Sequence, residues 1–198
     1  MLNKINKFIF LILFFAFSFS EESIAITTKS IGKVDYKKYS NDKSKKLKMG
    51  FELFNDDYIK TGKDGFVKFS YLDDGTTIKI HNNTEVYVRG KSDSKIINKR
   101  LNISNGTLKL DVSKQKEDEF TIVTPTSVAS VKGTKFIIES NIDFGDKFYG
   151  FEGIVEIVNK ESNKLIKLSR NLKVSSSPNG DIVSEIITPA DMDIINEI

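Results

Sequence analysis

Residues 66–89 read FVKFSYLDDGTTIKIHNNTEVYVR, and this segment carries the clearest secondary-structure signal in the chain. Apolar and polar residues alternate along 66–71, 76–80 and 84–89, which is the period of a strand with one buried face. The Asp74-Gly75 pair between the first two runs favours a tight turn, because glycine adopts the positive φ that such turns require. The segment therefore predicts consecutive β-strands.

The same pattern continues on both sides of this segment. Asp64-Gly65, Asn105-Gly106 and Asn179-Gly180 separate further runs that are rich in β-branched and aromatic residues. The glycines that precede apolar runs are unevenly spaced, which argues against a solenoid of fixed period; they are Gly65, Gly75, Gly106, Gly133 and Gly153. We therefore expect an all-β domain over about residues 26–187, an antiparallel rolled sheet or sandwich made of hairpins of different length.

A short helix is predicted at the C-terminus. Thr188 can cap it, Pro189 suits its first position, and Asp191 stands where a capping box places an acidic partner. Four apolar side chains would then share one face: Ala190, Ile194, Ile195 and Ile198. Such a helix could close the end of the sheet or could dock a partner, and we expect the first, because amphipathic helices mostly face their own core.

The first 25 residues have the pattern of an export signal. Lys4 and Lys7 precede residues 8–19, in which Ser18 is the only polar residue. This run suits a signal peptide and is shorter than the roughly 20 apolar residues that span a bilayer. An uncleaved membrane anchor is the alternative. Two pairs of small residues suit the positions before a cleavage site, Ser18 with Ser20 and Ser23 with Ala25. We expect a signal peptide over residues 1–25 and one exported domain over residues 26–198.

The composition excludes several kinds of site. The chain of 198 residues has no cysteine and one histidine, His81, which rules out disulfides, a lipid-modified N-terminal cysteine, thiolate metal sites and sites with two imidazoles. A net charge of +3 argues against a dedicated nucleic-acid binder. Asp56-Asp57 and Asp73-Asp74 could bind calcium, but no EF-hand spacing surrounds them, so we interpret them as loop caps. We predict no catalytic residue, no metal site and no cofactor.

Several motifs together resemble the FecR domain, named for the ferric-citrate regulator of the bacterial envelope. They occur in the family's order from Gly50 to Gly153, after a leading Ile31-Gly32-Lys33-Val34: Asp57-Tyr58-Ile59-Lys60-Thr61-Gly62, Leu72-Asp73-Asp74-Gly75-Thr76, Leu101 to Leu110, Phe120-Thr121-Ile122-Val123-Thr124-Pro125, Val131-Lys132-Gly133-Thr134-Lys135-Phe136 and Gly153-Ile154-Val155-Glu156-Ile157. The resemblance implies a β-helix-like rolled domain with a motif core over residues 50–158. Lys132 replaces the usual Arg, and Arg170-Asn171 stands where many members have Gly-Gln.

The motif residues are interpreted as positions that specify the fold rather than as a reaction centre, because Gly-Thr and Asp-Gly pairs mostly occur where a turn requires a particular backbone conformation. They are Thr61, Gly62, Asp74, Gly75, Gly106, Pro125, Gly133, Thr134, Phe136 and Gly153. The founding members of the family contact a sigma factor through a cytoplasmic segment. Only about seven residues precede the hydrophobic run here, so we expect a free-standing exported FecR-domain protein.

A cluster of lysines marks residues 33–48. Its members could contact anionic envelope polymers such as lipopolysaccharide or cell-wall glycan, although a solvated loop is the simpler interpretation. The candidate contact residues are Lys37, Lys38, Lys43, Lys45, Lys46 and Lys48.

The sequence therefore supports three hypotheses about function. The first is a non-enzymatic ligand- or protein-binding module of the cell envelope, in the periplasm or at the cell surface, with an envelope protein or glycan as its partner. The second is the periplasmic component of a signalling system that regulates an extracytoplasmic sigma factor through another chain. The third, carbohydrate hydrolysis, requires two carboxylates about 5–10 Å apart in a cleft. We expect the first, with no nucleic acid as partner and no membrane contact beyond an uncleaved signal segment.

Overall fold

The computed structural model describes residues 21–38, 42–93, 96–115 and 119–197. The predicted signal peptide falls mostly outside these ranges and stays a prediction. Within the described ranges, no helix is long and apolar enough to cross a bilayer. The described chain forms seventeen strands and one C-terminal helix, which confirms the predicted all-β class with a short terminal helix.

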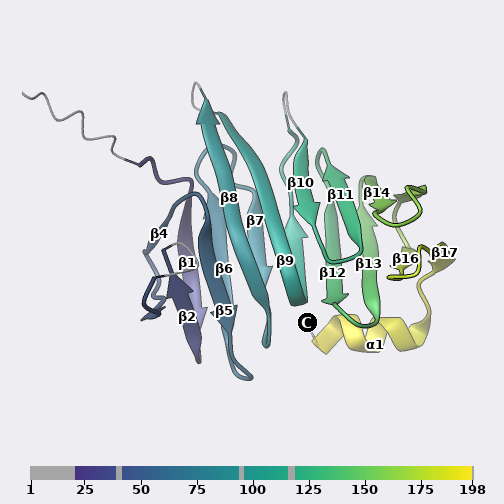
Figure 1. Ribbon diagram of the computed structural model, residues 1–198, viewed down its shortest axis with the longest axis horizontal. Helices are drawn as coiled ribbons and strands as arrows, with labels where there is room; N and C mark the ends of the chain where they lie inside the picture. Colours follow the sequence, from purple (N-terminus) through teal and green to yellow (C-terminus); the bar gives the residue numbers. More distant parts are fainter. Residues whose placement is uncertain (1–20, 39–41, 94–95, 116–118, 198) are drawn as a thin grey trace, which may run out of the picture.

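The strands form two packed layers that are continuous with one another (Figure 1). Layer I contains, in order of pairing, β4 (Glu52–Leu53), β1 (Ala25–Ile31), β6 (Phe66–Tyr71), β7 (Thr77–Ile80), the second part of β9 (Ile96–Asp111), β12 (Lys135–Asn141), β13 (Gly145–Glu152), β16 (Leu172–Ser176) and β17 (Ile182–Ile186). Layer II contains β3 (Lys45–Lys46), β2 (Val34–Lys37), β5 (Asp57–Thr61), β8 (Glu85–Asp93), the first part of β9, β10 (Phe120–Val123), β11 (Ser127–Val131), β14 (Val155–Asn159) and β15 (Leu165–Leu168).

Strand β9 joins the two layers. Its residues up to Asn105 pair with β8 and β10, and its residues from Gly106 onward pair with β7 and β12. The pairing between β9 and β10 is parallel, and the other pairings are antiparallel. Asn105-Gly106 was expected to separate two strands, but it lies inside β9. Gly106 has a φ of +108°, so the chain changes layer there while its ladder continues.

The core lies between the layers and follows the predicted alternation. In β6, Val67, Phe69 and Tyr71 are buried, whereas the residues between them are partly exposed. The Tyr71 and Phe120 rings meet edge to face across the two layers at 5.7 Å. These inward side chains form one continuous apolar cluster, so the two layers share a single core.

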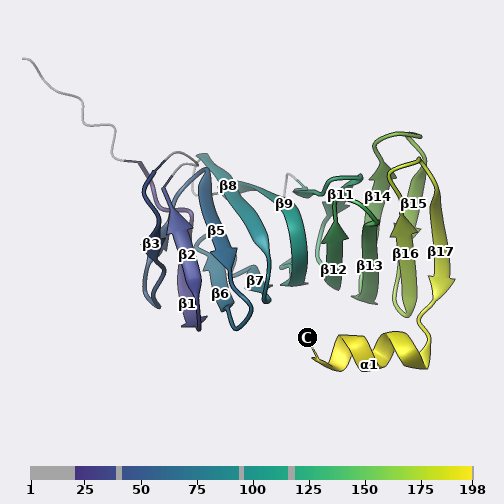
Figure 2. The ribbon, with the colours of Figure 1, turned by 60° about the horizontal axis from the view of Figure 1, so that its bottom comes forward.

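Helix α1 (Pro189–Glu197) has the predicted cap but not the predicted place. The Thr188 backbone N–H and hydroxyl both donate to Asp191 Oδ2, at 2.8 and 2.6 Å, and the Asp191 N–H donates back to Thr188 Oγ1 at 3.3 Å. Ile195 packs on Ile137 and Tyr149, on the outward face of layer I. The helix therefore covers β12 and β13 from outside rather than closing the end between the layers (Figure 2).

Candidate functional site

The hairpin tip, residues 141–145 between β12 and β13, exposes two large apolar side chains. Phe144 is 84% exposed and Ile142 is 66% exposed. Asn141 Oδ1 accepts hydrogen bonds from the backbone N–H groups of Asp143 and Phe144, at 2.9 and 3.1 Å, and this fixes the turn. An ordered turn that holds a phenyl ring in water is typical of a contact surface for another macromolecule.

A buried carboxylate anchors this tip to the neighbouring turn. Asp146 is almost fully buried. Its Oδ2 accepts hydrogen bonds from the hydroxyls of Thr124, at 2.5 Å, and Thr126, and its Oδ1 accepts from Ser140 Oγ at 2.7 Å. Hydrogen bonds of this kind stabilise a buried charge and fix the groups around it.

The polar network continues beneath the next two turns. Ser127 Oγ donates to Ser176 Oγ at 2.8 Å, and Asn159 Nδ2 donates to Ser176 Oγ and to the Ser177 carbonyl, both at 2.9 Å. Asn159 Oδ1 in turn accepts from the backbone N–H of Glu161 at 2.9 Å. Hydrogen bonds therefore join the β10–β11, β12–β13, β14–β15 and β16–β17 turns, which lie at the same end of their strands. The hairpin tip thus has a rigid base.

Two grooves flank the hairpin tip. One has prolines and aliphatic groups in its wall and is lined by Pro125, Thr126, Ile142, Lys160, Glu161, Ser177 and Pro178. The other is rich in amides, which can donate to and accept from a peptide backbone, and its lining includes Asn82, Asn83, Asn105, Asn141 and Phe144. The tip and its grooves thus combine an apolar projection with polar concave surfaces.

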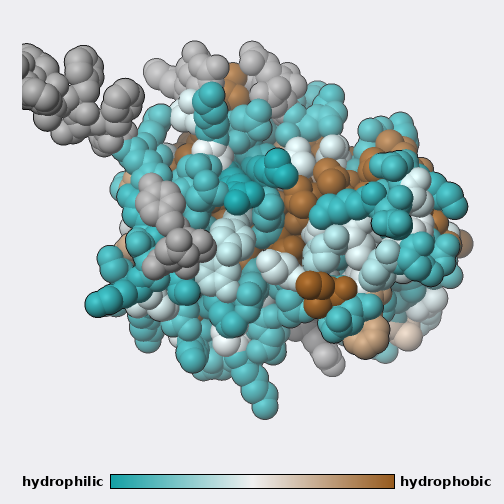
Figure 3. All heavy atoms as spheres, viewed as in Figure 1, coloured by the Kyte–Doolittle hydropathy of each residue, from teal (hydrophilic) through white to brown (hydrophobic). Residues whose placement is uncertain are grey.

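The outward face of layer II supplies a further apolar area. Directly paired positions on β10, β11, β14 and β15 hold Val123, Val128, Val158 and Leu165 in one row. Figure 3, which views this face, shows a brown area over the region of β9 to β11 and a largely hydrophilic surface over β2, β5 and β8. The apolar surface of this face therefore lies mainly in the C-terminal half of the domain.

The lysines predicted to contact an anionic partner lie at the opposite end of the molecule, around β2 and β3 (Figure 2). Lys45 and Lys46 are exposed on β3, a short edge strand where charge discourages pairing with other chains. Lys38 forms an ion pair with Glu21 at 2.8 Å, and Lys37 lies over the Tyr58 ring at 5.8 Å. Lys43 and Lys48 are exposed in the flanking loops. The structure does not bring this group near the hairpin tip.

The predicted fold-specifying positions form three separate groups and do not make one surface. Thr61 Oγ1 accepts from the Thr84 N–H at 2.9 Å, and Gly106 lies so close to Thr84 that a Cβ would collide with it; Gly62 adjoins this group. Gly133 and Thr134 pack against Gly153, whose φ is +75°. Asp74 and Gly75 form the β6–β7 turn, and Phe136 is buried in the core. Pro125 and Gly106 line the two grooves beside the hairpin tip, one in each.

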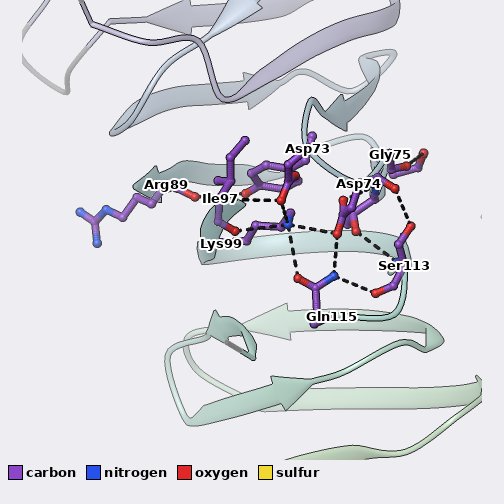
Figure 4. A network of polar contacts seen from close by, with 11 residues as sticks. Asp73, Asp74, Gly75, Arg89, Ile97, Lys99, Ser113 and Gln115 are labelled. Atoms are coloured by element: carbon purple, nitrogen blue, oxygen red, sulfur yellow. Dashed lines mark hydrogen bonds and ion pairs between the residues drawn. The ribbon is translucent and has the colours of Figure 1, made fainter. Parts of the chain in front are cut away.

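Asp73 and Asp74 surround a buried lysine rather than an open metal site (Figure 4). Lys99 Nζ lies 2.5 Å from Asp73 Oδ2 and 3.0 Å from Asp74 Oδ2, and the lysine side chain is 1% exposed. Burial alone would raise the pKa of Asp74, but hydrogen bonds from Thr76, Gln115 and Lys99 hold it below its usual value. Asp74 also caps its own turn through the Thr76 N–H at 2.8 Å, as expected of a loop cap.

The carboxylates of the other acidic pair, Asp56 and Asp57, also bind protein groups. Asp56 pairs with Arg89, and Asp57 accepts hydrogen bonds from Tyr36 Oη at 2.9 Å and from the Phe54 N–H at 2.7 Å. Burial raises the pKa of Asp57 to about 6. Across the described ranges, no three acidic or imidazole side chains are grouped as metal ligands.

His81 lies on the outward face of layer I, where its ring meets Phe66 edge to face at 5.4 Å. Burial first, and then the charges of Lys109 and Lys79, lower the pKa of His81 from 6.5 to about 4. The unfolded chain therefore binds more protons at this residue than the folded chain between those two pKa values, and stability falls as the pH falls through this window.

We expect the wild-type protein to lose more free energy of unfolding than the His81→Gln variant between about pH 7 and about pH 4.5. Urea titrations of both proteins at each pH measure the difference. The contribution of Asp57 has the opposite sign, because its raised pKa favours the folded state at low pH, but both proteins share it. Parallel pH profiles for the two proteins would contradict the expectation.

Comparison with known proteins supports the family resemblance. The model of the FecR protein family matches residues 57–147, from β5 into β13. Two crystal structures, at 2.50 and 1.65 Å resolution, of a "putative anti-sigma factor" from Parabacteroides distasonis ATCC 8503 share the fold, with TM-scores of 0.57 and 0.58 and sequence identities of 16% and 17%. The matches cover 69% and 70% of this chain. The chain spans only 62% and 64% of the solved chains. A search of curated proteins found no match.

Proposed function

We propose, from the premise that residues 57–147 are a FecR segment, that the protein is a non-enzymatic, exported binding module of the bacterial cell envelope whose partner is a protein. The observation that carries the proposal is the hairpin tip, where Phe144 and Ile142 stand in solvent on a base of buried hydrogen bonds. A rigid apolar projection loses little conformational entropy when it enters a pocket of a partner. A protein partner supplies such pockets more readily than a glycan does.

Export by a signal peptide is part of the proposal, with residues 26–198 forming one domain. Ile24 and Ala25 are buried, and the Ile24 N–H and carbonyl pair with Leu53 and Leu72. Cleavage after Ala25 would remove these core residues. Cleavage after Ser20, with Ser18 and Ser20 as the small residues, would keep them, and we favour that position.

Photocrosslinking in intact cells tests the role of the hairpin tip. A benzophenone amino acid at position 144 is expected to give a discrete adduct with one envelope protein, because the phenyl ring stands at the centre of the proposed contact. The same amino acid at Ile186, which is 73% exposed on β17, is the matched control and is expected to give no such adduct.

Serine substitutions then separate binding from folding. Ile142→Ser/Phe144→Ser is expected to lower capture of that partner at least about tenfold, whereas Met49→Ser/Ile186→Ser, which removes two equally exposed apolar side chains, leaves it unchanged. Both double variants should keep the wild-type unfolding midpoint. Equal crosslinking from positions 144 and 186, or capture that survives the first double variant, would contradict the proposal.

The alternative function is the periplasmic component of a signalling system that acts on an extracytoplasmic sigma factor through another chain. The description of the two solved neighbours favours it. The identity of the crosslinked protein distinguishes the two functions. A transmembrane partner with a cytoplasmic sigma-binding segment would support signalling, and an envelope protein without one would support a binding role alone.

A further inference from the structure

Four lysines form a continuous row on the outward face of layer I. Lys29 on β1 is directly opposite Lys68 on β6, Lys68 is opposite Lys79 on β7, and Lys79 is opposite Lys109 on β9. Neighbouring strands lie about 4.8 Å apart, so these side chains stand in a line across four strands. In Figure 2, β1, β6 and β7 lie at the end of the molecule away from α1, so the helix leaves Lys29, Lys68 and Lys79 open. Lys109 lies nearer the helix, because it is opposite Ile137, on which Ile195 packs.

The lysines of the row are not neutralised by ion pairs within the described parts of the chain, although the Asp111 carboxylate lines the cavity that three of them share. None of the four ammonium groups forms an ion pair there, and Lys29 instead lies over the Phe66 ring at 5.5 Å. Like charges directly opposite one another on a sheet are destabilising. Lys79 and Lys109 also contribute to the low pKa of His81, so the field of the row reaches the neighbouring residues. Repulsion between these lysines therefore lowers the stability of the free protein, and a bound anion would relieve that repulsion.

An apolar hollow adjoins the row. Lys68, Lys79 and Lys109 line a cavity of about 300 Å³ together with the partly buried Phe151. Leu110 and Phe136 border this cavity, but both are 1% exposed and belong to the inner core. The only carboxylate among its lining residues is that of Asp111. A line of positive charge beside a hollow that Phe151 lines suits a ligand that is acidic along its length and has an apolar side chain at one point.

We propose that the lysine row binds an extended acidic segment of a partner polypeptide, with one apolar side chain of that segment in the hollow beside Phe151. An extended peptide presents side chains on one face about every 6.6–7 Å, which the flexible lysine side chains can reach from their positions on neighbouring strands. A polyphosphate would match the charge but has no apolar group to place in the hollow. The charge and the hollow together therefore favour a polypeptide.

The inference uses the proposed function only in taking a polypeptide as the ligand, and its test uses the purified protein alone. The probe is a fluorescent decapeptide with alternating Glu and Thr and a terminal Phe, titrated at low salt. Lys68→Gln/Lys79→Gln/Lys109→Gln is expected to weaken binding at least about tenfold and to reduce its salt dependence. The matched control, Lys45→Gln/Lys46→Gln/Lys48→Gln, removes the same charge from the β3 region and is expected to change the affinity less than about twofold.

A second comparison tests the hollow. Phe151→Ser is expected to weaken the binding of the Phe-terminated peptide and to leave the binding of a peptide without Phe unchanged. The unfolding midpoint of the lysine-row variant should equal or exceed that of the wild type, because the substitution relieves repulsion between like charges. Equal loss of affinity in the control variant, tighter binding of inorganic polyphosphate or oligo-dT than of the peptide, or no binding by the wild type would overturn the proposal. None of these outcomes bears on the hairpin tip.

Discussion

Replacing Lys99 by Met is expected to lower the free energy of unfolding by about 3–5 kcal/mol, because it leaves two largely buried carboxylates without their cation. Lys99 Nζ contacts Asp73, Asp74, the Ile97 carbonyl and Gln115, and it lies 5.6 Å from the centre of the Tyr71 ring. The methionine has similar volume, so the loss arises from the charge rather than from a cavity. Urea-induced unfolding followed by circular dichroism measures the change.

The matched control for this substitution is Lys167→Met. Lys167 forms an ion pair with Glu156 at 2.9 Å, but its side chain is 62% exposed, so the expected change is below about 1 kcal/mol. The triple variant Lys99→Met/Asp73→Asn/Asp74→Asn should recover part of the lost stability, since it removes the unpaired charges. If Lys99→Met and Lys167→Met changed the free energy of unfolding equally, the buried ion network would not stabilise the packing of the β6–β7 turn on β9.

Replacing Asp146 by Ala is expected to cost about 2–4 kcal/mol of unfolding free energy, because the hydroxyls of Thr124, Thr126 and Ser140 lose their shared acceptor inside the protein. The same substitution should reduce partner capture at the hairpin tip even at temperatures where the variant is folded, because the tip loses its anchor to the 124–127 turn. Urea unfolding and crosslinking from position 144 measure the two effects.

The control for this prediction lies three residues away. Asp143 is exposed at the hairpin tip, so Asp143→Ala should change the stability by no more than about 0.5 kcal/mol and should keep the turn, whose hydrogen bonds come from Asn141. A folded Asp146→Ala variant with wild-type capture would separate the network from the function of the tip.

The sequence predicts local features well because they depend on neighbouring residues. The turn at Asp74-Gly75 and the cap formed by Thr188 and Asp191 are where their motifs place them. The layer change at Gly106 was not predicted, because the same positive φ serves a hairpin turn and a bend within a continuing ladder. The place of α1 also depends on which outward residues of β12 and β13 are apolar, and this requires the strand register.

The candidate sites were harder to predict than the fold. Phe144 and Ile142 belong to none of the family motifs, and their importance comes from exposure, which the sequence does not give. The row formed by Lys29, Lys68, Lys79 and Lys109 depends on the register of four strands, whereas the lysines at 37–48 form a cluster that is visible in the sequence itself. A buried charge at Lys99 could have been inferred from the sequence, because Lys99 lies between Ile97 and Leu101 at an inward position where alternation predicts an apolar side chain.

The sharing of β9 between the layers has a mechanical consequence. A partner that pulls on the hairpin tip along the strand direction loads β12, whose ladder to β9 runs from Lys135 to Ser140. Hydrogen bonds perpendicular to the strands resist such a load together, in shear, rather than opening one after another. Because β9 is also paired with β7, β8 and β10, the tension spreads into both layers. The domain can thus act as a stiff link, passing a pull at one edge to the strands that carry the lysine row.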